Sequence, residues 1–278
     1  MLEKYKKYLK FKDYHAQYYN QVKNFIKWLK NSDIEYIDID YNILMDYILY
    51  LKSENLENGT INNYIKSIRF FYRYLIDNNL VNIEILEDIY KIKLLKTIIK
   101  IHSYLIEEEL EEIIEMGMTF CYRMDPFKLS CILRFLFYTG LRKNEFIRLK
   151  RSNFDFRNKT VSVKGKTKNR QEREVPLTNE LTNGLQFYFS SEPEEKNAFN
   201  FSEGQLVSLL KDLQDFAPKN KKLSPHILRH SYGRLLARKG VNVRVAQKLL
   251  GHKNISSTLI YYDVTIDEAK KIFWEKIG

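Results

Sequence analysis

The chain has 278 residues, of which 44% are hydrophobic and 14% aromatic, and its formal net charge is +11 at pH 7. This length accommodates two domains with buried cores, or one large domain. The sequence contains no apolar run that could span a membrane and no signal peptide, and its two cysteines, Cys121 and Cys131, fit neither a disulfide framework nor a zinc motif. We therefore expect a soluble, basic, cytoplasmic protein without a metal site.

Residues 1–92 predict a small helical bundle. Apolar residues recur at the i, i+3, i+4, i+7 spacing over residues 22–29 and 44–51, as they do on the buried face of a helix. Thr60 is the expected N-cap of a third amphipathic helix that continues to Leu75. No enzyme signature occurs in this part of the sequence.

Residues 93–104 lack clean periodicity, which favours a linker between two domains. Beyond them, the acidic run over 107–115 predicts a solvated helix with apolar residues on its inner side. The segment 126–138 is apolar on most sides, which indicates the buried centre of a second core.

The phrase TGLRKNE follows this apolar segment. Gly140 permits a sharp turn, so Arg142 is expected to begin the next helix close to the buried one. Glu145 comes three residues later and can reach back to orient a neighbouring basic group or a backbone amide. By itself, an arginine after a glycine turn is more often part of a surface ion pair, so its interpretation depends on the residues that accompany it.

A β-hairpin is predicted from two strands at 159–163 and 172–177, joined by the polar turn KGKTKNRQ. A hairpin with a basic tip can follow the groove of a nucleic acid and place one ammonium near a leaving oxygen. Considered alone, the turn is an ordinary basic loop. The basic residues of the tip are Lys164, Lys166, Lys168 and Arg170.

A helix-start signal opens the phrase SPHILRH, with Ser224 as N-cap and Pro225 at the first helical position. His226 and Arg229 are three residues apart and project from one face of the first turns, where the backbone N–H groups and the helix dipole favour an anion. His226 and His230 could bind zinc from one helix face, but no third ligand is evident, so we interpret His230 as a histidine that either is structural or supports the catalytic residues.

Two glycines, Gly240 and Gly251, are suited to end this helix and the next one in the left-handed conformation. His252 follows the second stop directly, and Tyr261 lies nine residues further along. A histidine, an arginine, a second histidine and a tyrosine around an anion pocket predict chemistry on a phosphodiester.

The basic residues are concentrated in two windows. Residues 219–253 contain ten Lys or Arg residues, three histidines and no acidic residue, and residues 142–174 carry a net charge of +8. Together the windows carry +18, which exceeds the net charge of the whole chain. This concentration favours a surface for a polyanion over a generally solvated basic face.

With these residues in this order, the chain resembles the tyrosine recombinase (phage integrase) family. The matching phrases are TGLRKNE, VKGKTKNRQEREVPL, HILRH and LGHKNISSTLIYY, which span residues 105–265, and GTINNYIKSIRFFYRYL is similar to the family's helical core-binding domain. We expect no extra N-terminal arm-binding module, so the chain looks closer to the compact Xer-like members.

The resemblance implies a mainly α fold with a small antiparallel β-hairpin or sheet. It implies a SAM-like core-binding domain at 1–92, an interdomain linker at 93–104 and a mixed α+β catalytic domain at 105–278. A tail helix is expected at 265–276.

The resemblance also implies a mechanism. Tyr261 would attack the scissile phosphate and form a 3′-phosphotyrosyl link, and the family's spacing from the second histidine selects Tyr261 over the adjacent Tyr262. Arg142 and Arg229 would clamp the non-bridging oxygens, for which planar guanidinium groups are suited. Glu145 would support this arrangement.

Proton transfer would use the remaining residues. Lys164 would protonate the departing 5′-oxygen, although Lys166 lies on the same hairpin tip and stays an alternative. His226 would assist proton transfer near the tyrosine, and His252 would hold a phosphate oxygen. No ATP, metal or other cofactor is implied.

The implied partners are a double-stranded DNA recombination site and other copies of the chain, in a tetramer that the tail helix assembles on two sites. A catalytically inactive DNA-binding relative and a type IB topoisomerase are the alternatives. The complete set of catalytic residue types argues against the first, and the domain pair with its tail argues against the second. The candidates for DNA contact are the following basic residues: Lys66, Arg69, Arg73, Lys143, Lys166, Lys168, Arg170, Lys221, Lys222, Arg244 and Lys253.

Overall fold

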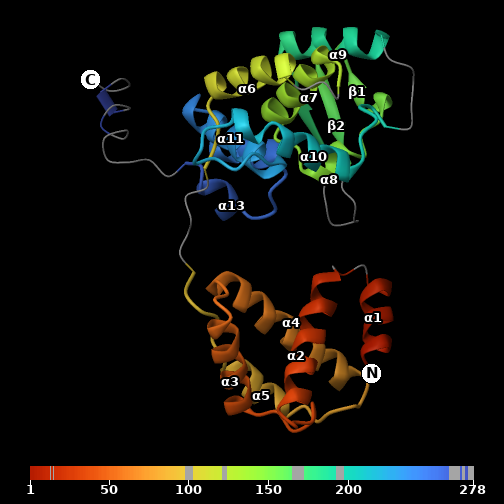
Figure 1. Cartoon of the computed structure of the whole chain (residues 1–278), viewed down its shortest axis with the longest axis vertical. Helices are drawn as coiled ribbons and strands as arrows, with labels where there is room; N and C mark the ends of the chain where they lie inside the picture. The colour runs from red at the N-terminus through yellow and green to blue at the C-terminus, as the bar shows by residue number, and fades with distance from the viewer. Residues whose placement is uncertain are drawn as a thin grey trace. The chain divides into compact units, whose positions relative to one another are not determined.

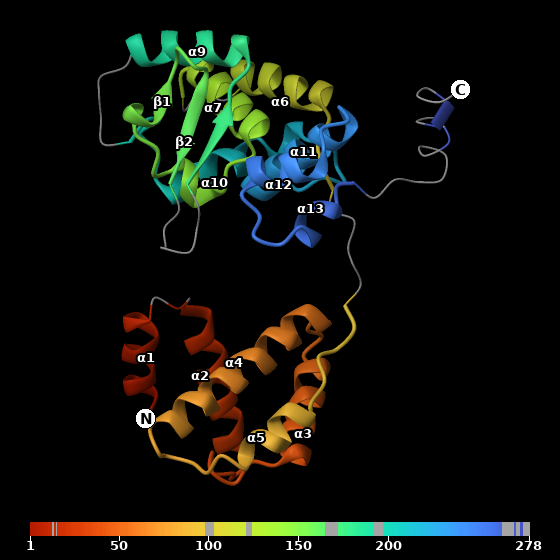
Figure 2. The same ribbon diagram turned by 180° about the vertical axis from the view of Figure 1, so that it is seen from behind.

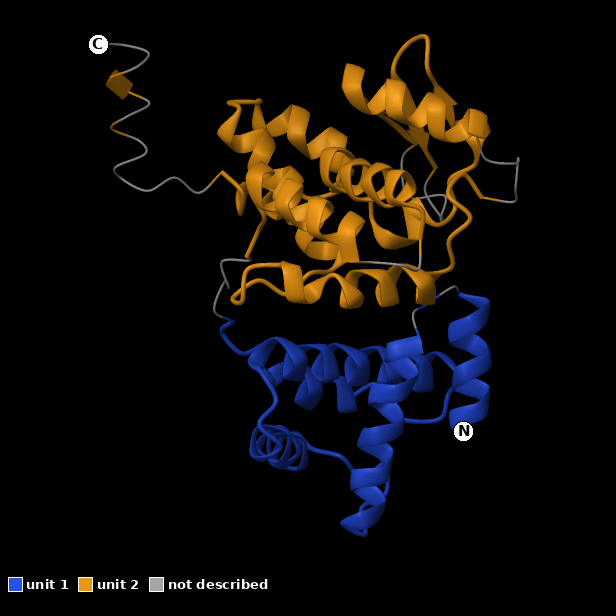
Figure 3. Ribbon diagram, turned by 45° about the horizontal axis from the view of Figure 1, so that its top comes forward, with its two compact units in different colours: residues 1–100 blue, residues 101–278 orange. Residues whose placement is uncertain are grey.

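The computed structural model describes residues 1–12, 14, 16–97, 103–120, 124–164, 172–191, 197–262, 270 and 273–274. The chain divides into two compact units, Met1–Lys100 and Ile101–Gly278 (Figure 3). Each unit has its own hydrophobic core.

The described residues of the first unit form a bundle of five helices: α1 (Leu2–Phe11), α2 (Ala16–Asn31), α3 (Tyr41–Ser53), α4 (Asn58–Asp77) and α5 (Ile85–Lys91) (Figure 1). Aromatic side chains occupy much of its core, and Tyr5, Phe25 and Phe71 are fully buried. The Tyr72 hydroxyl donates a hydrogen bond to the Tyr36 carbonyl at 2.6 Å, so this buried polar group is satisfied.

Helix α4 begins earlier than the sequence predicts, because Glu57 and not Thr60 occupies the N-cap position. The physical reason is a contact distant in sequence: the Asn58 side chain donates to the Lys96 carbonyl at 2.7 Å. One turn later, Asn62 donates to the Leu95 carbonyl at 2.9 Å and accepts from the Leu95 amide at 2.8 Å. These bonds hold the first turns of α4 against the chain that follows α5.

The second unit is built around α7 (Pro126–Thr139), which packs against α6 (Glu107–Phe120), α9 (Asn179–Ser191) and α11 (Pro225–Arg238) (Figures 1 and 2). Asp125 caps α7 by accepting a hydrogen bond from the Lys128 amide at 2.9 Å. Apolar residues on most sides of α7 are buried, as the sequence pattern predicts. The remaining helical elements are α8 (Lys143–Phe146), η1 (Arg151–Asn153), α10 (Glu203–Asp212), η2 (Gln214–Phe216), α12 (Val243–Leu250) and α13 (Ser256–Leu259).

An antiparallel sheet of three described strands lies beside α7 and α9, in the order β1 (Phe154–Asp155), β2 (Thr160–Val163), β3 (Arg173–Pro176). Val161 pairs with Val175, and Val163 pairs with Arg173. The hairpin predicted from the sequence is therefore formed by β2 and β3, with β1 added at one edge. Its tip residues Lys166, Lys168 and Arg170 lie outside the described residues.

The predicted fold class is confirmed, since the described chain is mainly α-helical with one small antiparallel sheet. Of the expected tail helix at 265–276, the structure describes only residues 270 and 273–274. None of the described helices is both long and apolar enough to cross a bilayer.

Candidate active site

The turn between α7 and α8 places Arg142. Gly140 ends α7 with a φ of +58°, and a Cβ atom there would lie 2.4 Å from the Tyr232 ring, so a side chain is excluded by conformation and by space. Arg142 is the N-cap of α8. Glu145 reaches back, as the sequence suggests: one carboxylate oxygen accepts from the Arg142 amide and the other from its guanidinium, each at 2.9 Å.

The Glu145 carboxylate also binds Arg173 on β3. The two Arg173 Nη atoms donate to the two carboxylate oxygens at 3.1 and 2.8 Å, and Arg173 Nε donates to the Leu249 carbonyl at 2.8 Å. Burial alone would raise the pKa of Glu145, but the hydrogen bonds and charges of Arg173 and Arg142 outweigh it and lower this pKa to about 2. Glu145 is therefore an anion that holds two cations in place.

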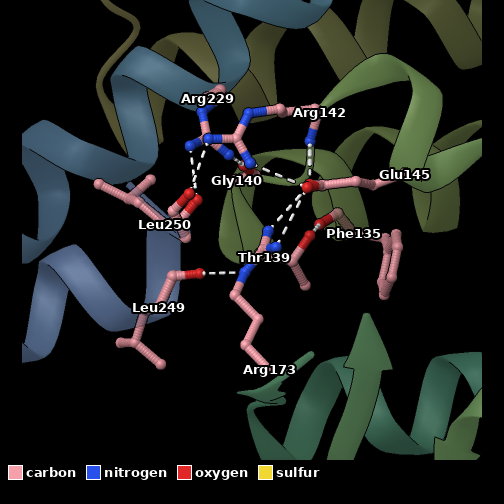
Figure 4. Close-up of polar contacts among 10 residues, drawn as sticks. Phe135, Thr139, Gly140, Arg142, Glu145, Arg173, Arg229, Leu249 and Leu250 are labelled. Atoms are coloured by element: carbon pink, nitrogen blue, oxygen red, sulfur yellow. Dashed lines mark hydrogen bonds and ion pairs between the residues drawn. The ribbon is translucent and has the colours of Figure 1, made fainter. Parts of the chain in front are cut away.

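Arg229 lies on α11 and is buried. Its guanidinium donates to the carbonyls of Gly140 and Leu250, both at 2.6 Å, while Arg142 donates to the Gly251 carbonyl at 2.9 Å. Figure 4 shows the side chains of Arg142, Glu145, Arg173 and Arg229 converging from α8, β3 and α11. Backbone carbonyls at the ends of α7 and α12 thus fix the direction of two guanidinium groups.

The arginine cluster has more positive than negative charge. Burial and the charges of Arg142 and Arg173 together lower the pKa of Arg229 to about 9, and the charge of Glu145 acts against this shift. Arg229 remains protonated at neutral pH, and its positive charge is not fully compensated by Glu145. Such a preorganised cluster favours the binding of an anion.

Tyr261 follows α13, and its side chain is buried. Its hydroxyl is hydrogen-bonded to Nδ1 of His230 at 2.7 Å, and its carbonyl accepts from Arg234 at 2.9 Å. Burial raises the pKa of Tyr261, and the positive charges of Arg229 and Arg142 act against this rise, so the phenol lies within the field of the two arginines. Tyr262 differs, because its hydroxyl donates to the Val241 carbonyl at 2.7 Å.

His252 follows Gly251, which ends α12 with a φ of +65°. Its Nδ1 is hydrogen-bonded to the Thr258 hydroxyl at 2.9 Å, and its ring lies nearly parallel to that of Tyr261, with centroids 6.4 Å apart. Burial, together with the charges of Arg229 and Arg142, lowers the pKa of His252 to about 4. The imidazole is therefore neutral at pH 7 and can act as a hydrogen-bond donor.

Two further candidates lie at the margin of this cluster. His226 is in the first turn of α11, where Ser224 caps the helix, and its side chain is exposed. Lys164 follows β2, has 72% of its side chain exposed and lies 3.9 Å from Glu172. The choice between Lys164 and Lys166 stays open, since Lys166 is outside the described residues.

The remaining basic candidates fall into two groups. Three of them bind other parts of the protein: Arg69 donates to the Ile92 carbonyl and covers the Tyr90 ring, Lys143 pairs with Glu203, and Lys221 binds both carboxylate oxygens of Glu109 at 2.6 and 2.7 Å. The others that the structure describes are exposed: Lys66, Arg73, Lys222, Arg244 and Lys253.

The sequence analysis did not identify Arg173 as part of the cluster. It also did not identify His230 as a contact of Tyr261. Arg173 carried a usable signal. It comes two residues before the buried Val175 on β3, so both side chains lie on the inner face of the sheet, where an arginine needs a counter-ion. The sequence does not show that Glu145 is this partner.

A buried phenol beside guanidinium groups with uncompensated charge is suited to an enzyme that transfers a phosphate ester to a tyrosine. Comparison with known proteins agrees with this class. The phage integrase family model matches residues 103–268, and the model of the phage integrase SAM-like domain matches residues 1–93. The chain belongs to the phage integrase family, the tyrosine recombinases, which are enzymes that cleave and rejoin DNA.

Its relatives include a tyrosine recombinase of Pseudothermotoga lettingae, 29% identical over 91% of this chain and 87% of the relative. Tyrosine recombinase XerA of Saccharolobus solfataricus is 31% identical over 79% of this chain and 68% of the relative. Among solved structures, the Tn1549 transposon integrase in complex with transposon right end DNA matches with a TM-score of 0.74 at 16% identity, over 100% of this chain and 99% of that one. XerH bound to a palindromic difH substrate matches with a TM-score of 0.70 at 21% identity, over 93% and 79%. The predicted family and the predicted enzyme class, a site-specific recombinase, are confirmed.

Proposed function

We propose that this recombinase binds a double-stranded DNA recombination site and exchanges strands there through a 3′-phosphotyrosyl intermediate on Tyr261. The observation that carries the proposal is the position of the Tyr261 phenol. It is buried, it is held by α11 of its own chain, and it lies in the field of Arg142 and Arg229. Tyr262 is bound elsewhere through its hydroxyl.

In this proposal Arg142 and Arg229 bind the non-bridging oxygens of the scissile phosphate. A guanidinium has five N–H donors. Within the described part of the chain, Arg142 uses two of its donors for Glu145 and Gly251, and Arg229 uses two for Gly140 and Leu250. These bonds orient the remaining donors of each guanidinium. Because the donors are oriented before the substrate arrives, stabilising the growing charge of the transition state requires little reorganisation.

The other groups move protons or complete the pocket. His252 is neutral at pH 7 and donates a hydrogen bond to a phosphate oxygen, while His226 assists proton transfer near the tyrosine. Lys164, on the hairpin formed by β2 and β3, protonates the departing 5′-oxygen. The phosphotyrosyl link conserves the energy of the phosphodiester, so a 5′-hydroxyl can reverse the step without ATP.

We assign DNA binding to both units. Residues 1–92 form the core-binding domain, with Lys66 and Arg73 exposed on α4, and residues 105–278 form the catalytic domain. In the catalytic domain, Lys222, Arg244 and Lys253 are exposed and suited to contacts with phosphates. Arg69, Lys143 and Lys221 are weaker candidates, because each already binds a group of its own unit. We place the active protein in the cytoplasm as a tetramer on two DNA sites.

The test is covalent trapping. Duplexes that bind the full-length protein are selected from a random-sequence pool, and a nick is introduced next to the mapped cleavage point so that the short 5′-hydroxyl fragment is lost after cleavage. We expect the protein and its Tyr262→Phe variant to form a covalent adduct, and Tyr261→Phe to form none. Adduct formation by Tyr261→Phe would contradict the assignment, and binding without any adduct would indicate an inactive DNA-binding relative. Relaxation of a supercoiled plasmid without recombinant product would indicate a topoisomerase.

A further inference from the structure

Three residues on one face of α11, at positions 230, 233 and 234, hold Tyr261. His230 Nδ1 is hydrogen-bonded to the phenolic hydroxyl at 2.7 Å, and Arg234 donates to the Tyr261 carbonyl at 2.9 Å. Between them, Gly233 lets the tyrosine ring lie directly on the helix, because a Cβ atom there would come within 2.6 Å of two ring carbons. The contact between the histidine and the tyrosine is thus formed by local packing that requires a glycine.

The phenol needs a proton acceptor before it can attack phosphorus. An ordinary tyrosine has a pKa near 10, and burial raises the pKa of Tyr261 further, so the hydroxyl is neutral at pH 7. Arg229 and Arg142 stabilise the phenolate that forms, but guanidinium groups cannot accept the proton. A neutral imidazole within hydrogen-bond distance can, because its ordinary pKa is close to the operating pH.

Among the site histidines, the hydrogen-bond geometry singles out one. His252 uses Nδ1 for Thr258, and burial together with the nearby arginines lowers its pKa to about 4, which makes it a weak base. His226 lies one turn before His230 on the same helix face and is exposed. The printed sequence alone favours His226, because it is the histidine that precedes Arg229 in the family's phrase.

We propose that His230 is the general base that removes the proton of Tyr261, a role that rests on the proposed function of Tyr261 as nucleophile. The Tyr261 O–H bond breaks and its proton moves to His230 Nδ1 as the bond from the phenolic oxygen to phosphorus forms. The bond from phosphorus to the 5′-oxygen breaks, and Lys164 gives that oxygen its proton. In religation the 5′-hydroxyl returns its proton to Lys164, and the leaving phenolate takes one back from His230. His226 then assists by relaying protons between His230 and solvent.

The test compares matched variants in single-turnover adduct formation on the nicked duplex. His230→Asn retains a hydrogen-bonding atom near the position of Nδ1 but removes the base, and we expect it to slow adduct formation by about 10²–10⁴-fold. His230→Gln serves as a second variant. Duplex binding by gel shift and thermal unfolding identify any variant that fails to fold, and only folded variants are compared.

A more acidic phenol at position 261 distinguishes a histidine that acts as a general base from one that is only structural. A fluorinated tyrosine is introduced at position 261 of the full chain in the wild type, His230→Asn and His226→Asn. We expect the acidic phenol to recover about ten-fold of the His230→Asn loss, because a lower pKa reduces the need for a base. A histidine that only packs against the ring would show no such recovery. An unchanged rate in His230→Asn, no recovery by the fluorinated phenol, or equal recovery in His226→Asn would overturn the proposal.

Failure of this inference is distinguishable from failure of the proposed function. If Tyr261→Phe still forms the adduct, the nucleophile has been assigned wrongly, and the role of His230 falls with it. If Tyr261→Phe forms none while His230→Asn reacts at the wild-type rate, Tyr261 keeps its role and only the base assignment is wrong.

Discussion

Arg173 binds the carboxylate of Glu145 through two hydrogen bonds, and the same carboxylate holds the guanidinium of Arg142. Arg173 also pairs across the sheet with Val163, the residue before Lys164, and donates to the Leu249 carbonyl at the end of α12. One buried ion pair therefore connects the base of the hairpin, the arginine of α8 and the turn that carries His252. Arg173 is a positioning residue in this arrangement, because it acts through Arg142.

Replacement of Arg173 should impair both stability and cleavage. Arg173→Gln leaves Glu145 paired with Arg142 but removes two charge-assisted hydrogen bonds to the buried carboxylate, so we expect it to lower the free energy of unfolding by about 3 kcal/mol. Displacement of Arg142 should slow adduct formation by about 10²-fold. Urea denaturation and single-turnover trapping provide the two measurements. Arg173→Lys keeps the charge without the planar fork and should lie between wild type and Arg173→Gln; equal rates in all three would refute the positioning role.

The low pKa of Glu145 predicts an acid-sensitive contribution to stability. A carboxyl whose pKa is about 2 in the folded protein and 4.5 in its ordinary state stabilises the fold fully above pH 4.5. The contribution, about 3 kcal/mol, is lost as the pH falls from 4.5 towards 2. The free-energy difference between wild type and Glu145→Gln, measured by urea denaturation, should therefore shrink between pH 6 and pH 3. A difference independent of pH would show that the carboxylate charge is not what stabilises this site.

Gly233→Ala should abolish cleavage by displacing the Tyr261 ring. An added Cβ atom would meet the Tyr261 ring at 2.6 Å and displace the phenol from α11. Alanine is a better helix former than glycine by about 1 kcal/mol, so a weaker helix cannot explain the loss. The matched control is Gly204→Ala in α10, where nothing lies within 4 Å of the added atom. Gel shift should show unchanged DNA binding for both variants; adduct formation by Gly233→Ala at the wild-type rate would be inconsistent with the docked position of Tyr261.

The local parts of the site could be predicted from the sequence, because their geometry is set within a few residues. The turn at Gly140, the start of α8 at Arg142 and the return contact of Glu145 all follow from spacing along one segment. The cap of α11 at Ser224 is predictable for the same reason.

Contacts between distant segments could not be predicted in this way. Arg173 is 28 residues from Glu145, and only the packing of β3 against α8 and α12 brings them together. The sequence indicates for His230 only a structural or supporting role, and it does not show that this histidine contacts Tyr261. The position of the Tyr261 ring on α11 decides which histidine contacts the phenol. Gly233, one turn after His230, sets that position. Thr60 was wrong as an N-cap for a similar reason, since Asn58 and Asn62 bind residues more than 30 positions away.

Lys164 and Lys166 can be distinguished by changing the leaving group. A substrate with sulfur in place of the bridging 5′-oxygen releases a thiolate, whose low pKa removes the need for a general acid. Lys164→Ala should slow cleavage of the oxygen substrate by about 10²–10⁴-fold and should cleave the sulfur substrate at nearly the wild-type rate. Lys166→Ala is the matched variant from the same hairpin. If it shows this rescue and Lys164→Ala does not, the general acid is Lys166.

The end of the chain is expected to act in assembly. Phe273 and Trp274 are 49% and 67% exposed, and apolar side chains of this size are suited to burial against another surface. If that surface belongs to a neighbouring copy, deletion of 264–278 should leave binding to one DNA site unchanged and reduce the complex that joins two sites. Native gels with one-site and two-site duplexes measure both, and Phe273→Ala with Trp274→Ala tests the two side chains without shortening the chain. Equal weakening of both complexes would instead place the tail against its own domain, because loss of an internal contact would impair each protomer before assembly begins.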